Sequence, residues 1–226
     1  MKIKLFKKIA MSAAVIATTF LAACSSTNST SSSEEISIRE PESTTLSSES
    51  NNPESSNSSE TDMASAGKTL ILYFSWSNNT KTMAGYIHGE IGGDMEQIVP
   101  VVAYPEVYSE VADYAKEERD NNARPKFNSL THNPEDYDTI FVGYPVWWYT
   151  IPMIIHTLFE TYDFSGKTIV PFNTHEGSGD GGTYETIQKI APKATVLKGL
   201  PIRGGDISKD SAKEDVKKWL KEIGLK

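Results

Sequence analysis

The sequence predicts one α/β domain in which a doubly wound, five-stranded parallel sheet lies between two layers of helices, a three-layer α/β/α arrangement. Apolar runs of strand length recur along residues 67–226, and they are continuous, as is typical of parallel strands buried on both faces. Stretches with helical periodicity separate these runs. The length of 226 residues and the hydrophobic content of 38% allow one domain of ordinary size.

Each predicted strand is followed by a predicted helix. The strands are expected at residues 69–74, 95–99, 139–142, 168–172 and 194–197. The first helix is indicated by an apolar stripe of Met83, Ala84, Ile87 and Ile91, and three further helices are expected near residues 106–121, 153–159 and 184–190. In a doubly wound sheet, ligands bind beyond the carboxyl ends of the strands. The loops after strands one, three and four are therefore where a site is expected.

The last helix carries signals for both of its ends. Ser211 and Glu214 have the spacing of a capping box, which predicts where the helix starts. Gly224 predicts where it ends. Between these signals runs an apolar stripe that is expected to face the core: Val216, Trp219, Leu220 and Ile223.

Residues 1–23 have the pattern of an export signal. Four lysines precede an apolar stretch that ends in small residues and is short for a permanent membrane helix. Residues 21–24, Leu-Ala-Ala-Cys, resemble the lipobox of bacterial lipoproteins, in which the cysteine becomes the lipidated first residue of the mature chain. We therefore expect lipid, such as palmitate, on Cys24 and a location on the extracytoplasmic face of the cell membrane. The alternative is an ordinary secretory signal with a chance cysteine.

Residues 24–66 are expected to be the lipidated cysteine followed by a disordered tether. Of the 42 residues 25–66, 16 are serine, and the apolar residues are isolated. Such a segment cannot bury enough apolar surface to offset its conformational entropy. As a flexible coil it would reach roughly 35 Å. The folded domain is expected to begin at about Gly67 and to extend to residue 226.

Charge and motif content exclude several function classes. Lys and Arg total 22 against 30 Asp and Glu, and the net charge of −8 has the wrong sign for a nucleic-acid binder. Because Cys24 is the only cysteine, intramolecular disulfides and thiolate zinc clusters are impossible. No His-Glu-x-x-His motif or calcium-loop spacing occurs, so no metal site is expected.

The loop after the first strand is rich in hydroxyl and amide groups. It comprises Ser75, Trp76, Ser77, Asn78, Asn79 and Thr80 and opens a helix, where free backbone N–H groups and the helix dipole favour an anion. Such a loop suits a phosphate monoester. The alternative is an ordinary helix cap with polar neighbours. The glycine patterns of a P-loop and of a dinucleotide-binding turn are both absent.

Residues 75–80 resemble the phosphate loop of the flavodoxin family, which binds flavin mononucleotide (FMN). That family usually has glycine where Asn78 stands here, and asparagine is the next most tolerant residue of a left-handed backbone. Residues 143–153 and 171–179 are similar to the loops that follow the third and fourth strands in this family. The resemblance covers about 160 residues in the correct order, and it implies a flavodoxin-like fold with FMN as cofactor.

The resemblance also implies which residues surround the flavin ring. They are Pro145, Val146, Trp147, Trp148 and Tyr149 in one loop, and Asn173, Thr174, His175, Gly177, Ser178 and Gly179 in the other. Aromatic side chains can stack against a flat ring. Backbone N–H groups of the glycine turn can approach its polar edge. The alternative for the three adjacent aromatic residues is core packing, but three such rings cannot all point inward.

His175 and Glu176 are the candidate catalytic residues. They could supply or remove a proton near the reduced flavin, or pair with a substrate. The alternative is that they are ordinary polar loop residues.

The sequence therefore favours a membrane-anchored, extracytoplasmic FMN protein that transfers electrons. Its expected partners are FMN, membrane lipid through Cys24, and a redox protein or a quinone, with no nucleic acid and no metal. One alternative is an FMN-dependent oxidoreductase that reduces quinones or small molecules. Another is a surface binding protein that keeps the fold without the flavin.

Overall fold

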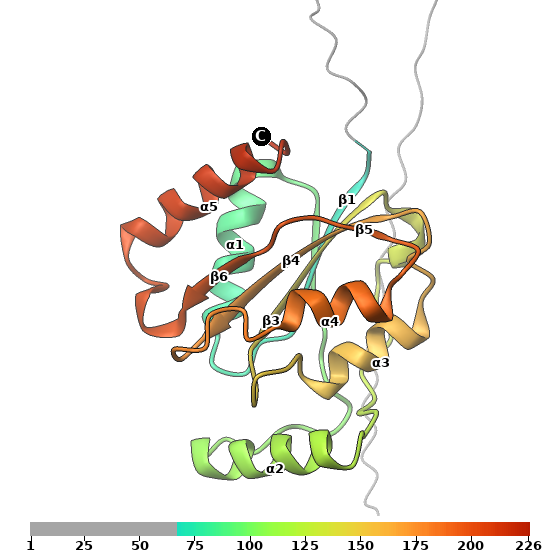
Figure 1. Ribbon diagram of the computed structural model, residues 1–226, viewed down its shortest axis with the longest axis vertical. Coiled ribbons are helices and arrows are strands. Elements are labelled where there is room, and N and C mark those ends of the chain that lie inside the picture. The colour runs from blue at the N-terminus through green and yellow to red at the C-terminus, as the bar shows by residue number, and fades with distance from the viewer. Residues whose placement is uncertain (1–66) are drawn as a thin grey trace, which may run out of the picture. The chain divides into compact units, whose positions relative to one another are not determined.

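The computed structural model describes residues 67–226 (Figure 1). The predicted signal peptide at residues 1–23, the lipidated Cys24 and the predicted tether through residue 66 lie outside the described residues. Within residues 67–226, none of the helices combines the length and the apolar character that a membrane crossing requires.

A parallel sheet forms the middle layer of the domain. Its strands lie in the order β2-β1-β3-β4-β5, and every pair is parallel. The strands are β1 (Thr69–Tyr73), β2 (Asp94–Gln97), β3 (Thr139–Pro145), β4 (Thr168–His175) and β5 (Thr195–Val196). The order reverses direction at β1 and β3, which makes this edge the switch point of a doubly wound sheet. The predicted fold class is therefore confirmed.

A sixth strand, β6 (Leu200–Arg203), is not among the predicted ones. It pairs with residues 172–175 of β4, whereas β5 pairs with residues 168–169, so β5 and β6 follow each other along the same edge of β4. The interruption includes Gly199, where a Cβ would collide with the ring of Tyr184. The fifth position of the sheet is thus one strand broken in two.

The helices cover both faces of the sheet (Figure 1). One layer contains α1 (Asn79–Ile91) and α5 (Asp210–Glu222), and the other contains α2 (Tyr108–Asp120), α3 (Met153–Thr161) and α4 (Thr183–Ile190). The continuous apolar runs explain this arrangement, because successive side chains of a strand point to opposite faces. In β1, Leu70 and Leu72 belong to the α3 side and Ile71 and Tyr73 to the α1 side.

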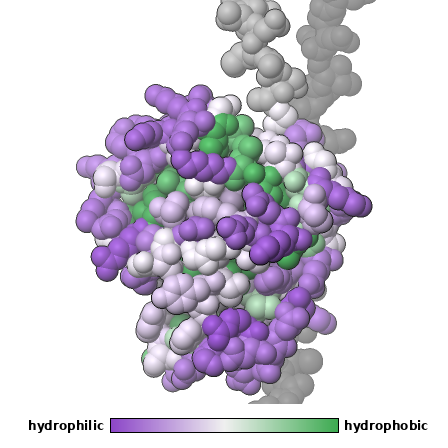
Figure 2. Space-filling view, in the orientation of Figure 1, coloured by the Kyte–Doolittle hydropathy of each residue, from purple (hydrophilic) through white to green (hydrophobic). Residues whose placement is uncertain are grey.

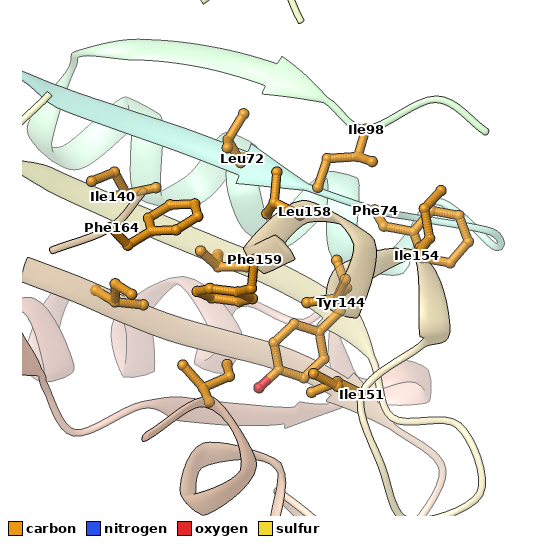
Figure 3. Packing of buried hydrophobic residues seen from close by; sticks show 14 of the residues in the cluster. Leu72, Phe74, Ile98, Ile140, Tyr144, Ile151, Ile154, Leu158, Phe159 and Phe164 are labelled. Carbon is orange, nitrogen blue, oxygen red and sulfur yellow. The ribbon is translucent and has the colours of Figure 1, made fainter. Parts of the chain in front are cut away.

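Figure 3 shows the core on the α3 side of the sheet. Leu158 and Phe159 of α3 pack against strand side chains such as Leu72 and Ile140, and Phe74 lies at the end of β1. Figure 2 shows one face of the domain, which is largely hydrophilic, with apolar residues gathered in smaller patches. The core therefore fixes the ends of β1 and β3, which position the site.

The predicted capping box of the last helix is wrong. Helix α5 begins at Asp210, its N-cap residue is Lys209, and Ser211 already lies inside the first turn. Glu214 instead pairs with Lys217 one turn later. The turn in which Lys209 N donates to Asp206 O sets the start of the helix. Val216, Trp219 and Leu220 of the predicted stripe are buried, whereas Ile223 is the C-cap residue and is only half-buried. The end near Gly224 (φ 76°) agrees with the prediction.

Two glycines are expected to respond in opposite ways to replacement by alanine. At Gly143, in the middle of β3, a Cβ would collide with the ring of Phe172, so Gly143→Ala should destabilise the protein by about 1–3 kcal/mol. At Gly85, an exposed position inside α1, a Cβ meets no atom within 4 Å, so Gly85→Ala should stabilise it by about 1 kcal/mol. Urea unfolding of both variants measures the difference. Equal effects would contradict the packing around Gly143.

Candidate functional site

The three loops singled out in the sequence meet at the carboxyl edge of the sheet. Tyr73 at the end of β1 is in register with Gly143, and Pro145 at the end of β3 is in register with Thr174 of β4. The backbone N–H of Val146 also donates to the carbonyl of Thr174 at 2.8 Å. The strand register therefore brings the loops that begin at residues 75, 146 and 176 side by side.

The first loop turns into α1 through a left-handed residue. Asn78, the N-cap of α1, has φ 66° and ψ −3°, and its carbonyl accepts a hydrogen bond of 2.9 Å from Thr82 N. Most L residues are strained in this conformation, whereas glycine and asparagine adopt it. Asn78 thus has the backbone geometry that glycine would supply. The exposed side chains of Ser77 and Asn78 lie directly before the free N–H groups of the helix.

The remaining polar groups of this loop are held by neighbouring segments. Ser75 Oγ accepts from Lys81 N at 3.2 Å. Thr80 is buried, and its hydroxyl shares a hydrogen bond of 2.9 Å with the hydroxyl of Thr174 in β4. Asn79 lies beside Gly204, where a Cβ would approach both its amide and the Glu176 carboxylate to 2.6 Å. The loop is therefore fixed before any ligand arrives.

A cavity of about 490 Å³ opens beside this loop. Predicted residues of all three loops line it, namely Trp76, Val146, Trp147, Trp148, Tyr149, Glu176, Gly177 and Ser178. Helix α2 supplies the rest of the lining with Tyr108, Val111, Ala112 and Ala115. The volume and the largely aromatic walls suit a planar organic ligand. The other predicted residues do not line it: Ser75, Ser77, Asn78, Asn79, Thr80, Pro145, Asn173, Thr174, His175 and Gly179.

The three adjacent aromatic residues have different surroundings. Trp147 packs inward, with its ring centroid 5.3 Å from that of Phe74 and 5.2 Å from that of Tyr104. Trp148 and Tyr149 are 41% and 75% exposed at the mouth of the cavity. Trp147 and Thr150, which flank these two residues, exchange two backbone hydrogen bonds. Trp148 and Tyr149 between them have positive φ values of 52° and 59°. This is the geometry of a two-residue type I′ turn, in which Asn-Gly is usual.

Two indole N–H groups hold α2 and its entry loop against the other loops. Trp76 Nε1 donates to the carbonyl of Pro105 at 2.8 Å, and Trp148 Nε1 donates to the carbonyl of Ala112 in α2 at 2.8 Å. The Arg119 guanidinium lies 5.5 Å from the centre of the Trp148 ring. The spacing of Tyr108, Val111, Ala112 and Ala115 is a helical stripe that sequence analysis could have found. No sequence signal indicates that this stripe faces the loops.

The loop after β4 is held by its own side chains. The buried Asn173 donates from Nδ2 to the carbonyl of Gly179 at 3.1 Å and accepts from the Tyr184 hydroxyl at 2.5 Å. Gly177 N donates to His175 Nδ1 at 3.0 Å. Gly177 and Gly179 have φ 137° and 63°, which side chains with a Cβ rarely adopt. This leaves the backbone around Ser178 at the cavity wall without side-chain obstruction.

His175 and Glu176 differ in their relation to the cavity. Burial lowers the pKa of His175, so its imidazole is neutral at neutral pH, and Nδ1 accepts the Gly177 N–H. This contact positions the glycine turn. Glu176 is exposed and lines the cavity. Of the two candidate catalytic residues, only Glu176 is among the residues that line the cavity.

The residues present fit a flavin with a terminal phosphate. The hydroxyl-bearing loop at the start of α1 would hold the phosphate, and the aromatic walls would enclose the ring. Backbone N–H groups near Ser178 would reach its polar edge. A phosphate at this helix start would gain from the dipole of 13 helical residues without needing a lysine.

Comparison with known proteins agrees with this geometry. The flavodoxin family model matches residues 68–223. A candidate flavoprotein from Bacteroides eggerthii is 30% identical with a TM-score of 0.62, covering 71% of this chain and 99% of that chain. A flavoprotein from Lactobacillus acidophilus, solved in complex with FMN, is 27% identical with a TM-score of 0.50, covering 65% and 99%. No curated protein sequence gave a significant match.

Proposed function

The chain belongs to the flavodoxin family, and from this premise we propose that it is a lipid-anchored, extracytoplasmic protein that binds FMN and transfers electrons. One observation carries the proposal. The fixed loop at the start of α1 adjoins an aromatic cavity of about 490 Å³ at the switch point of the sheet. The related flavoprotein from Lactobacillus acidophilus holds FMN, which supports the same cofactor here.

FMN supplies one-electron and two-electron chemistry when it is bound, and the protein supplies orientation and environment. The loop of residues 75–80 would anchor the phosphate of a bound flavin. Trp147 and the α2 side chains Val111 and Ala115 line the cavity and would exclude water from a ring held there. Glu176 places a negative charge at the cavity wall, which disfavours further negative charge on the ring.

The proposed location rests on the sequence before the domain. The lipobox-like residues 21–24 and the single Cys24 favour a lipid anchor, and the serine-rich residues 25–66 favour a long tether. A domain held in this way meets redox proteins of the membrane and quinones, which we propose as its electron donors and acceptors.

Removal of Cys24 tests the anchor. In bacteria fed labelled palmitate, the wild-type chain is expected to carry label and to sediment with membranes. Cys24→Ser should carry no label, because the chain has no other cysteine to acylate. Label that persists in Cys24→Ser would exclude the lipobox assignment. A Ser25→Ala variant serves as the control and should behave as the wild type.

Titration with FMN and riboflavin tests the phosphate loop. We expect much tighter binding of FMN, because only FMN carries the phosphate. Ser77→Ala should weaken FMN binding by about 10- to 150-fold and leave riboflavin binding unchanged, since a hydrogen bond to a charged group contributes about 1.5–3 kcal/mol. Quenching of flavin fluorescence measures both affinities. The control is Ser211→Ala on α5, and equal affinity for FMN and riboflavin would refute the phosphate site.

A further inference from the structure

Aromatic rings in contact lead from the cavity to the surface beside α2. Trp147 lines the cavity, and its ring centroid lies 5.2 Å from that of Tyr104. Tyr104 lies in turn 5.5 Å from Tyr114, which is 39% exposed. Phe74 packs against both Trp147 and Tyr104, at 5.3 and 5.4 Å, and keeps water away from them. Because electron tunnelling falls steeply with distance, rings in contact favour electron transfer.

The middle ring of this series has a carboxylate partner. The Tyr104 hydroxyl donates to Glu118 Oε2 at 2.9 Å, and both residues are 8% exposed. Burial raises the pKa of Glu118, and burial also raises the pKa of Tyr104. A buried carboxylate is costly to keep in a fold. The packing of the Tyr104 ring against Phe74 and Trp147 does not by itself require a carboxylate at its hydroxyl.

We propose that Tyr104 is a redox-active tyrosine that passes an electron through Trp147 to light-excited flavin, a one-electron oxidant, in the cavity while its phenolic proton moves to Glu118. The proposal rests on the proposed function, because the oxidant occupies the flavin cavity. An oxidised phenol is a strong acid, so a hydrogen-bonded carboxylate makes the oxidation easier.

The step balances in electrons and protons. Tyr104 loses one electron, and its O–H bond breaks. A new O–H bond forms on Glu118, and the oxidant gains the electron. Trp147 gives up one electron and receives one, so it ends as it began. Tyr114 then gives one electron to the Tyr104 radical, and Glu118 returns its proton to the Tyr104 oxygen. Tyr114 is 39% exposed, so its own phenolic proton passes to water. One electron from an external reductant and one proton from water restore Tyr114. The series thus draws damaging oxidising equivalents out of the cavity.

The chain contains a matched control for this pair. Tyr137 also donates to a carboxylate, Asp94 Oδ2, at 2.7 Å. Its aromatic neighbour is His132 at 6.4 Å, and no residue of this pair lines the cavity. Tyr137 therefore has the same type of bond as Tyr104 and no contact with a tryptophan of the cavity.

The test uses the full chain loaded with FMN. Blue light turns the bound flavin into a one-electron oxidant, and electron paramagnetic resonance of the frozen sample detects the tyrosyl radical. All samples carry Tyr108→Phe and Tyr149→Phe, so that the exposed tyrosines at the cavity mouth cannot supply the signal. Tyr104→Phe is expected to lose most of the signal. Glu118→Gln should shorten the lifetime of the radical. Tyr137→Phe should leave both the signal and its lifetime unchanged.

A second arm needs no FMN. Azidyl radicals generated by pulse radiolysis oxidise tryptophan in the apoprotein, and absorbance follows the transfer from tryptophan to tyrosine. Tyr104→Phe should slow this transfer, and Tyr137→Phe should not. If the chain binds no FMN, the proposed function fails, but this arm still tests whether Tyr104 passes an electron to Trp147. If FMN binds but Tyr104→Phe and its parent variant, which carries only Tyr108→Phe and Tyr149→Phe, give equal radical yields and equal transfer rates, the electron-transfer proposal is refuted and the proposed function stands.

Discussion

Replacing Trp147 with alanine is expected to destabilise the protein by about 3 kcal/mol and to abolish tight FMN binding. The Trp147 ring packs edge-on against Phe74 and Tyr104 and also forms a wall of the cavity. Truncation would leave a void between the end of β1 and the segment before α2, because the backbone around Trp147 is fixed by its hydrogen bonds with Thr150. Urea unfolding of the apoprotein and an FMN titration measure the two effects.

Trp148→Ala is the matched control for this prediction. Trp148 is 41% exposed, and its loss removes one hydrogen bond to Ala112 and the contact with Arg119. The expected destabilisation is about 1 kcal/mol. Similar losses for both variants would mean that the packing of Trp147 against the core contributes little to stability. Tight FMN binding by Trp147→Ala would mean that the flavin ring does not occupy this cavity.

Continuous apolar runs allowed the sheet to be predicted from the sequence. The strands β1, β3 and β4 are buried on both faces, so their signal does not depend on a partner. The broken edge strand gave a weaker signal. Strand β5 spans only Thr195–Val196, and β6 contains Pro201, which cannot donate a backbone hydrogen bond. The place of β5 and β6 beside β4 is set by contacts with residues far away in the sequence.

The candidate site was predictable only as far as its loops. The loops follow three predicted strands, and parallel pairing places their ends together. The fourth wall of the cavity was missed, because the position of α2 depends on hydrogen bonds from Trp76 and Trp148 to backbone carbonyls of Pro105 and Ala112. These bonds join segments about thirty or more positions apart in the sequence. Local sequence patterns cannot predict such contacts. The hydrogen bond between the Thr80 and Thr174 hydroxyls was likewise not predictable, because it joins residues 94 positions apart.

Replacing Trp148 and Tyr149 together by Asn-Gly is expected to separate stability from cofactor binding. Both positions have positive φ, which costs about 1–2 kcal/mol for each ordinary residue, and Asn-Gly relieves this strain. The relief offsets the lost hydrogen bond to Ala112, which contributes about 1 kcal/mol. The apoprotein should therefore unfold at the same urea concentration as the wild type, or at a higher one.

FMN binding by the same variant should weaken by about 5- to 150-fold, because two rings leave the mouth of the cavity and each contributes about 0.5–1.5 kcal/mol. The control is Asn122→Gly, which changes another residue with positive φ (48°) outside the cavity lining without removing a ring, and it should keep its FMN affinity. A double variant that loses stability as Trp147→Ala does would show that the two rings hold the fold. Unchanged FMN affinity would show that the strained turn does not serve the cofactor. With stability kept and affinity lost, the strain in this turn is explained by its function, since a relaxed turn would fold as well but could not place two aromatic rings over the cavity.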